Sequence, residues 1–143
     1  MNDFKTVSAG FLANHMARLF AAGLLRRIQP LGLAPAQFMV LLELWDGDGK
    51  TQAELVAALD VEQATMANTL ARMQRDGLIE RHPSKTDKRA RNVFLTDLAR
   101  SLEHEAKAAA RAQNTAALSA LSAAEQRQFL DLMQRVIATM ARR

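Results

Sequence analysis

The chain contains no cysteine and no tyrosine among its 143 residues, and it holds only three prolines and six glycines. Without cysteine the protein forms no disulfide, no zinc–thiolate site and no thiol-based redox sensor. No run approaches the roughly 18 consecutive apolar residues of a membrane helix, and no signal-peptide pattern opens the sequence. We therefore expect a single domain of ordinary length that works in the cytoplasm, away from the membrane.

Patterns of catalytic and metal-binding residues are also missing. The three histidines, His15, His82 and His104, lie far apart with no ligand-like spacing. There is no glycine-rich phosphate loop and no nucleophile motif. The sequence therefore predicts no metal site, no cofactor and no enzyme.

What the chain does contain is helical periodicity. Apolar residues make up 49% of the chain, and most recur at spacings of three and four residues, as in amphipathic helices. The pattern predicts helices over residues 7–28, 35–45, 51–59, 62–76 and 97–119, and a last helix after Ser122. Residues 78–81 and 92–95 are the strand candidates. The expected fold is mainly α, with a small two-stranded β wing.

Two of the predicted helices are joined only by Asp60 and Val61. Thr51 and Glu54 form a capping box that opens the first helix, and Gly77 supplies a left-handed cap after the second. Two helices joined at a tight angle form a helix-turn-helix unit, whose second helix can lie in the major groove of DNA.

The second of these helices has a polar face suited to reading bases. Met66, Leu70 and Met73 recur on one side and are expected to face the core. Amides, guanidinium groups and threonine methyls all recognise base edges. The candidates on or near the other side are Gln63, Thr65, Asn68, Thr69 and Arg72. An ordinary solvent-exposed face is the alternative, because polar residues opposite a core stripe are expected anyway.

The segment between the two predicted strands carries the whole net charge. Residues 81–91 hold five basic side chains and one acid, so their balance of +4 equals that of the chain. Such a cluster attracts polyanions, although a solvated charged loop would look the same. A hairpin that follows a helix-turn-helix unit is a wing. Its DNA-contacting candidates are Lys85, Asp87, Lys88, Arg89 and Arg91.

An acid in a DNA-binding loop repels phosphate and needs another role. Arginine in a narrow minor groove is favoured by the negative potential there. Orientation of Arg89 through a charge-assisted hydrogen bond would give Asp87 such a role. Solubility of the loop is the alternative reason for an acid at this position.

These residues resemble the MarR family of bacterial regulators. Asp87-Lys88-Arg89-Ala90 with Leu95-Thr96 is similar to the family's wing signature. The segments 31–38 and 77–81 resemble its entry to the second helix and the end of its recognition helix. Val61-Glu62-Gln63 with Thr69-Leu70 resembles the SlyA-like branch. The resemblance implies a homodimeric repressor-type transcription regulator on pseudo-palindromic DNA, with Arg89 in the minor groove and Asp87 as its partner.

The terminal helices fit this interpretation independently. The last predicted helix shows Phe129, Leu130, Met133, Val136, Ile137 and Met140 along one side. Paired across a two-fold axis, it and the first helix would bury each other's apolar faces. We expect residues 1–30 and 97–143 to form the dimerisation helices and residues 35–96 to form the winged helix-turn-helix. Packing of both helices within one monomer is the alternative.

A regulator needs a way to release DNA, and this chain has no cysteine or metal cluster for the purpose. We predict that a small aromatic acid or phenol binds between the terminal helices and the DNA-binding region. The predicted ligand-binding residues are His15, Arg18 and Trp45, with His15 or Arg18 meeting the acid group. Otherwise the protein is controlled by its concentration, and His15 and Trp45 are plain core residues.

Other functional classes explain the sequence less well. A non-specific architectural DNA-binding protein would share the basic wing and is the main alternative. An interaction module without a DNA role would show no salt-dependent DNA binding. A small helical enzyme with a bound cofactor explains neither the charged wing nor the capped turn.

Overall fold

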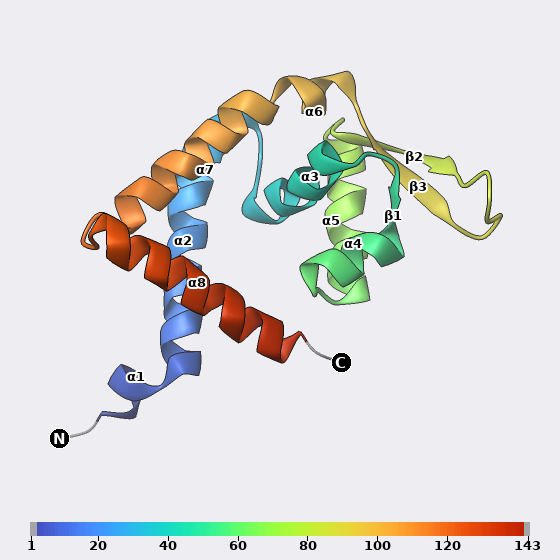
Figure 1. Cartoon of the computed structure of the whole chain (residues 1–143). Helices are drawn as coiled ribbons and strands as arrows, with labels where there is room; N and C mark the ends of the chain where they lie inside the picture. Colours follow the sequence, from blue (N-terminus) through green and yellow to red (C-terminus); the bar gives the residue numbers. More distant parts are fainter. Residues whose placement is uncertain (1–2, 142–143) are drawn as a thin grey trace.

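The computed structural model describes residues 3–141 and is mainly helical, with one small sheet (Figure 1). The helices are α1 Phe4–Val7, α2 Ala9–Ile28, the 3-10 turn η1 Gln29–Leu31, α3 Pro35–Asp46, α4 Gln52–Leu59, α5 Gln63–Arg75, α6 Asp97–Ser101, α7 Glu103–Ala117 and α8 Ala123–Met140. The strands are β1 Lys50–Thr51, β2 Ile79–Pro83 and β3 Arg91–Leu95. The predicted mainly helical fold with a β wing is confirmed.

The sheet contains the predicted two-stranded hairpin, formed by β2 and β3, and a third strand, β1, that was not predicted. Its order is β1-β3-β2 and both pairings are antiparallel. β1 contributes only Lys50 and Thr51, too short a segment to show an alternating pattern. The turn before it fixes its place. Gly49 has a φ of 79°, and a Cβ there would lie 2.9 Å from the ring of Phe94.

One predicted helix is divided in two, and a short helix that was not predicted precedes the first predicted one. The predicted helix over residues 97–119 is α6 followed by α7, which meet at Leu102. Near the N-terminus, the hydroxyl of Ser8 accepts a hydrogen bond from the N–H of Phe11 at 3.2 Å, so that α2 starts separately from α1. Apolar spacing continues across both breaks, and periodicity alone therefore does not reveal them.

The core lies between α3, α4, α5 and the sheet. Leu41, Leu55 and Leu70 are fully buried there. Ile28 of α2 and Ala106 of α7 belong to the same buried cluster. The two long helices are thereby attached to the helix-turn-helix region rather than lying free of it.

Both predicted capping boxes are present. The N–H of Thr51 donates to the carboxylate of Glu54 at 3.1 Å, and the N–H of Glu54 donates to the Thr51 hydroxyl at 3.2 Å. Ser122 and Glu125 repeat the arrangement at 2.8 and 3.2 Å. Donation from the backbone N–H of the cap residue is the main reason that the pKa of each glutamate lies below its ordinary value of 4.5.

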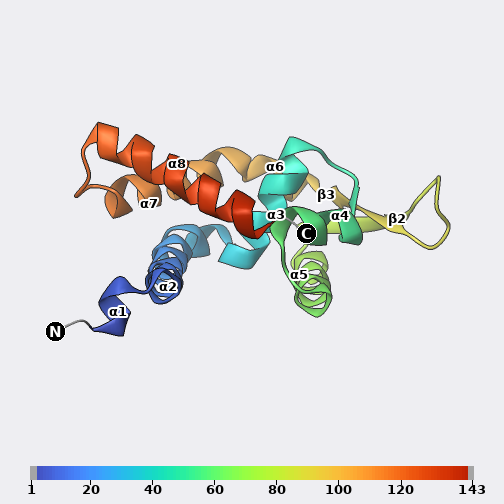
Figure 2. The same cartoon turned by 60° about the horizontal axis from the view of Figure 1, so that its bottom comes forward.

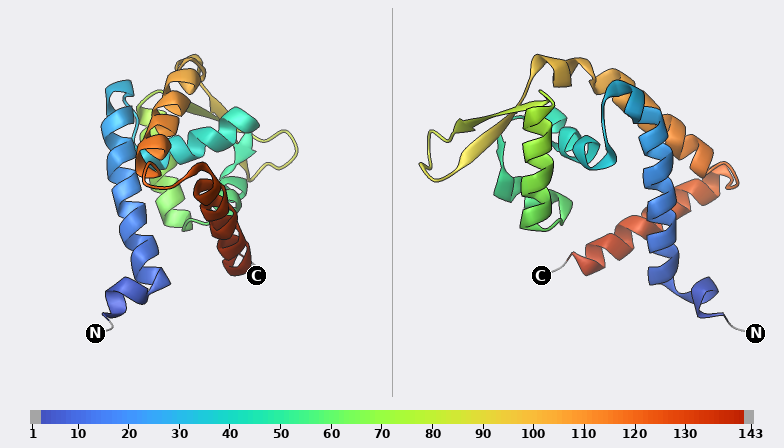
Figure 3. Two further views of the ribbon diagram at one scale, coloured as in Figure 1. Left: turned by 60° about the vertical axis from the view of Figure 1, so that its left-hand side comes forward. Right: turned by 180° about the vertical axis from the view of Figure 1, so that it is seen from behind.

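The wing lies at one end of the molecule and α1 and α2 lie toward the other (Figure 2). α2 and α7 run side by side, while α8 folds back from the end of α7 and its C-terminal end lies toward α4 and α5 (Figure 3). α8 has no buried residue, and Leu130, Val136, Ile137 and Met140 are exposed. Within residues 3–141, no helix is long and apolar enough to cross a membrane.

Candidate nucleic-acid interface

The recognition helix is α5, held against the core by three buried side chains. Met66, Leu70 and Met73 expose at most 1% of their surface, as the predicted inward stripe requires. The turn before α5 is tight because Asp60, the C-cap of α4, adopts a left-handed conformation with φ 52°. The opposite side of α5 is therefore turned toward solvent.

Most of the predicted base-reading side chains lie on this open side. Gln63, Thr65, Asn68 and Arg72 are exposed. Thr69 is half-buried, and its hydroxyl donates to the carbonyl of Thr65 at 2.9 Å. Its hydroxyl is thus occupied within the helix, which leaves its methyl group as the part suited to a base.

Sequence reasoning missed Arg75 on the same helix. Arg75 is exposed. It lies seven residues after Asn68 and three after Arg72, so all three side chains lie on the same side of the helix on neighbouring turns. Its Nε lies 3.3 Å from Oδ1 of Asp76. The same helical spacing could have revealed it from the sequence.

The wing holds its basic residues in an ordered loop between β2 and β3. Lys85, Asp87, Lys88 and Arg89 lie in that loop, Arg91 begins β3, and all five are exposed. The loop is closed on itself because the N–H of Ser84 donates to the carbonyl of Ala90 at 3.0 Å. Among the described residues, none of the basic four has an ion-pair partner, so their charge is available to phosphate.

The contact between Asp87 and Arg89 differs from the predicted one. Oδ1 of Asp87 accepts a hydrogen bond from the backbone N–H of Arg89 at 3.0 Å, rather than from its guanidinium. The two residues are separated by one position in a tight loop, and this spacing brings the backbone within reach of the carboxylate. In this structure Asp87 shapes the loop that carries Arg89 and leaves the guanidinium unpaired.

A hollow of about 490 Å³ separates the wing from the start of α4. Arg81, Arg89 and Arg91 line it together with Thr51 and Gln52. The Nε of Arg81 is buried there without a hydrogen-bond partner. Sequence reasoning counted Arg81 in the basic cluster but did not include it among the contacting residues.

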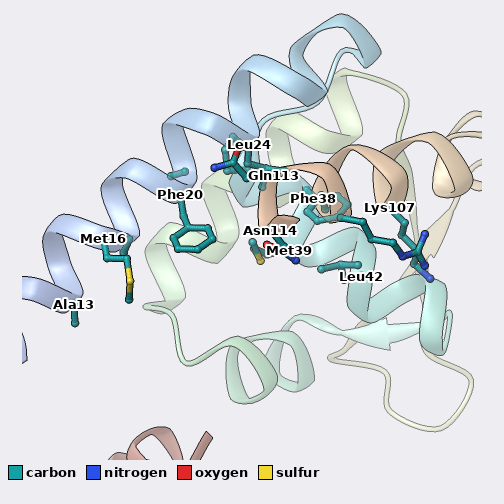
Figure 4. Close-up of a pocket in the computed structure, with 15 residues that line it drawn as sticks. Ala13, Met16, Phe20, Leu24, Phe38, Met39, Leu42, Lys107, Gln113 and Asn114 are labelled. Atoms are coloured by element: carbon teal, nitrogen blue, oxygen red, sulfur yellow. The ribbon is translucent and has the colours of Figure 1, made fainter. Parts of the chain in front are cut away.

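A second, apolar cavity of about 600 Å³ lies between α2, α3 and α7 (Figure 4). Met16 and Phe20 of α2 face Phe38 and Met39 of α3 across it. The charged residues in its lining are Lys107 and Arg111, both from α7.

The three predicted ligand-binding residues do not line this cavity. The α2 side chains that do are Ala13, Met16, Ala17, Phe20, Ala21 and Leu24. His15 and Arg18 fall between these positions on the helix and are exposed. Trp45 packs edge-on against Phe38 with 6.0 Å between ring centroids, and its Nε1 donates to the carbonyl of Ala99 at 3.1 Å. The apolar periodicity predicted the helix correctly but did not predict which of its sides faces the cavity.

Among residues 3–141, no three His, Cys, Asp or Glu side chains gather closely enough to hold a metal ion.

Comparison with known proteins agrees with this geometry. Residues 31–90 match the family model described as the MarR family. A probable transcriptional regulator from Pseudomonas aeruginosa is 29% identical, with a TM-score of 0.85 over 92% of this chain and 98% of that one. A mutant MarR from E. coli complexed with operator DNA is 25% identical, with a TM-score of 0.86 over 95% and 99% of the two chains.

A third similar structure is the PcaV transcriptional regulator from Streptomyces coelicolor in complex with its natural ligand. It is 23% identical, with a TM-score of 0.83 over 96% of each chain, which shows a shared fold. The match to the family model spans the helix-turn-helix and most of the wing, and the structural matches extend to the terminal helices. This chain therefore has the winged helix-turn-helix fold of MarR-family transcription regulators, and its residues 31–90 carry that family's sequence pattern.

Proposed function

We propose that the protein is a sequence-specific transcription regulator, of the repressor type, that binds pseudo-palindromic operators as a homodimer. One observation carries the proposal. α5 presents exposed polar side chains on the side opposite its three buried residues, and the unpaired basic wing follows it in the chain. Base-edge contacts specify sequence, while cationic contacts to phosphate position the protein.

The proposed dimer explains the exposed apolar surface of the terminal helices. Leu19 on α2 and Val136, Ile137 and Met140 on α8 are more than half exposed, which is costly for large apolar side chains in water. A second copy of the chain can bury these side chains, because a two-fold axis packs the same surface of both copies together. Residues 1–30 and 97–143 would then form the dimer region and residues 35–96 the DNA-binding region. Residues 1–2 and 142–143 lie outside the described part.

Two relatives support the assignment as a DNA-binding regulator. The E. coli MarR mutant was solved complexed with operator DNA, and the Pseudomonas aeruginosa protein is a probable transcriptional regulator. Assignment to the SlyA-like branch rests on Val61-Glu62-Gln63 and Thr69-Leu70 alone. A regulator of this kind would act in the cytoplasm, beside the chromosome.

We further propose that the apolar cavity binds a small aromatic acid or phenol that weakens operator binding. The cavity offers apolar walls with two cationic side chains, Lys107 and Arg111, which favours Arg111 or Lys107 over His15 or Arg18 as the partner of an acid group. PcaV, which shares the fold, was solved with its natural ligand. The ligand acts only through its different affinities for the DNA-bound and free arrangements.

A salicylate titration of the operator complex tests the ligand proposal. Millimolar salicylate should weaken operator binding by the wild type, and Arg111→Gln should respond less because it removes a positive charge from the cavity. His15→Ala is the matched control and should respond as the wild type does. If salicylate and related phenols leave operator affinity unchanged, the protein is controlled by its concentration.

A non-specific architectural DNA-binding protein is the second candidate, and the basic wing favours it as much as it favours a regulator. Phosphate contacts attract any sequence. The two candidates differ in what is recovered when the purified protein selects duplexes from a random pool. A regulator enriches two inverted half-sites whose centres lie about 10 base pairs apart, because symmetric recognition helices enter successive major grooves. An architectural protein enriches no motif, and that outcome would overturn the proposal.

A further inference from the structure

A buried amide links the cavity wall to the end of the recognition helix. Gln37 lies in the first turn of α3 and is 7% exposed, the only polar side chain buried to this degree among the residues that the structure describes. Its oxygen accepts from the N–H of Ala34 at 3.1 Å. Its nitrogen donates to Oδ2 of Asp76 at 3.0 Å. Both ends of the amide are therefore paired, as burial requires.

Asp76 occupies a position that does not favour an acid. It is the C-cap of α5, where the helix dipole disfavours negative charge. Its two oxygens instead receive hydrogen bonds from Gln37 and from Nε of Arg75, the latter at 3.3 Å. The bond from Gln37 is the main reason that the pKa of Asp76 lies below its ordinary value of 3.8. At neutral pH the carboxylate is charged, so the Gln37 bond is charge-assisted.

The other neighbours of Gln37 along α3 face the cavity. Pro35, Phe38 and Met39 are part of its lining (Figure 4). The first turn of α3 thus has one side against the apolar cavity, and its Gln37 side chain is bonded to the C-cap residue of the recognition helix. A shift of this turn moves the Gln37 amide, and the amide is bonded to Asp76.

We propose that Gln37 is a positioning residue that fixes the C-terminal end of α5 relative to the cavity wall. Through Asp76 it holds Arg72 and Arg75 in the arrangement that reads the operator, and occupancy of the cavity reaches α5 by the same link. This inference rests on the proposed DNA-binding function, because it describes how the recognition helix is held.

Gln37→Met removes both hydrogen bonds and retains the length and burial of the side chain. Its affinity for the duplex recovered from the random pool should fall by about tenfold, within the range seen when residues that couple two sites are changed. Its affinity for random-sequence DNA should stay as in the wild type, because the wing supplies the phosphate contacts. Ile28→Val, a mild core substitution that removes neither hydrogen bond of Gln37, is the matched control and should retain operator affinity.

Variants of Asp76 separate positioning from a general loss of packing. Asp76→Asn keeps an acceptor oxygen for the Gln37 amide and should retain most of the operator affinity. Asp76→Ala should lose as much as Gln37→Met. The double variant Gln37→Met/Asp76→Ala should lose no more than either single variant, because both break the same bond. Additive losses would overturn the proposal.

Hydrogen exchange in the free protein tests the link without DNA. In Gln37→Met the backbone amides of residues 74–78 should exchange faster than in the wild type, while the amides at the start of α5 should exchange at the wild-type rate. In the control Ile28→Val, the amides of residues 74–78 should also exchange at the wild-type rate. If the wild type selects no DNA sequence, the proposed function is wrong. The exchange rates would still show whether Gln37 holds the C-terminal end of α5. Unchanged exchange at residues 74–78, or unchanged operator affinity in Gln37→Met, would show that Gln37 does not position α5.

Discussion

Arg89 combines an exposed guanidinium with a firmly held backbone. Its N–H donates to Asp87, and the loop around it is closed by the bond from Ser84 to Ala90. The charge is therefore presented at a defined place without being neutralised. This is the arrangement that insertion into a narrow minor groove requires.

Replacing Arg89 by alanine should weaken operator binding by about 1–3 kcal/mol without unfolding the protein. The residue is exposed, so it contributes little to the core. Asp87→Ala should lose less, because Asp87 acts through the shape of the loop. A gel-shift titration compares the three proteins, with circular dichroism to check folding. Wild-type affinity in Arg89→Ala would remove the wing from the DNA interface.

Asn68 and Lys85 should differ in the kind of binding that they support. Asn68→Ala should cost about 1–3 kcal/mol on the operator and relax sequence preference, because an amide on α5 reads a base edge. Lys85→Ala should weaken all sequences alike and flatten the salt dependence by about one unit, because a wing lysine neutralises one phosphate. Titrations against operator and random duplexes at several salt concentrations measure both. If the two variants behave identically, α5 does not read bases.

The residue types of the interface could be predicted from the sequence, but several of their contacts could not. The exposed residues of α5 could be predicted because they lie opposite Met66, Leu70 and Met73, and helical geometry alone determines which residues share a face. The backbone bond of Asp87 depends on the conformation of a loop. The buried Nε of Arg81 depends on how the wing packs on α4. The spacing of Asp87 and Arg89 permits the backbone bond but does not select it over a guanidinium contact, and the burial of Arg81 has no local signal at all.

At the scale of elements, helix starts were more predictable than helix interruptions. The pairs Thr51–Glu54 and Ser122–Glu125 are local signals with a fixed spacing, and both form the expected bonds. The break at Leu102 depends on the way α6 and α7 pack on the core. β1 is fixed by the tight turn at Gly49 and by pairing with a strand more than 40 residues away.

The α4 capping box should make part of the folding stability depend on pH. The pKa of Glu54 is lowered in the folded state, so its contribution is present above the unfolded value and is lost as pH falls through the lower, folded value. Glu54→Gln keeps an acceptor for the Thr51 N–H but cannot be protonated in this range. In urea unfolding at pH 6 and pH 3, it should lose less stability than the wild type. An equal loss would mean that the Glu54 charge contributes nothing.

At the scale of the whole molecule, α8 is the element whose surface one chain does not cover. Val136→Glu/Ile137→Glu should convert the protein to a monomer, because it places two charges in the proposed dimer interface. Ala138→Glu, on the opposite side of the same helix, is the matched control and should remain dimeric. Light scattering after gel filtration measures both masses. A wild type that is already a stable monomer would contradict the dimer.

The overall architecture could be predicted from the sequence because its signals are local and repeated. The lining of the cavity could not be predicted in this way. The cavity forms where α2, α3 and α7 converge, and its lining depends on the rotation of α2 about its own axis. A stripe containing His15 and a stripe containing Ala13 and Ala17 are both apolar in sequence. Only packing against α7 selects the second.

The central claim is that two copies of this chain read one DNA sequence, and the specificity ratio tests it most directly. Affinity for the selected operator is compared with affinity for a scrambled duplex of equal length at one physiological salt concentration, with the mass of the complex measured in parallel. We predict two chains per duplex and a preference of at least about a thousandfold. A complex with one chain, or affinities that agree within a few-fold, would contradict the account.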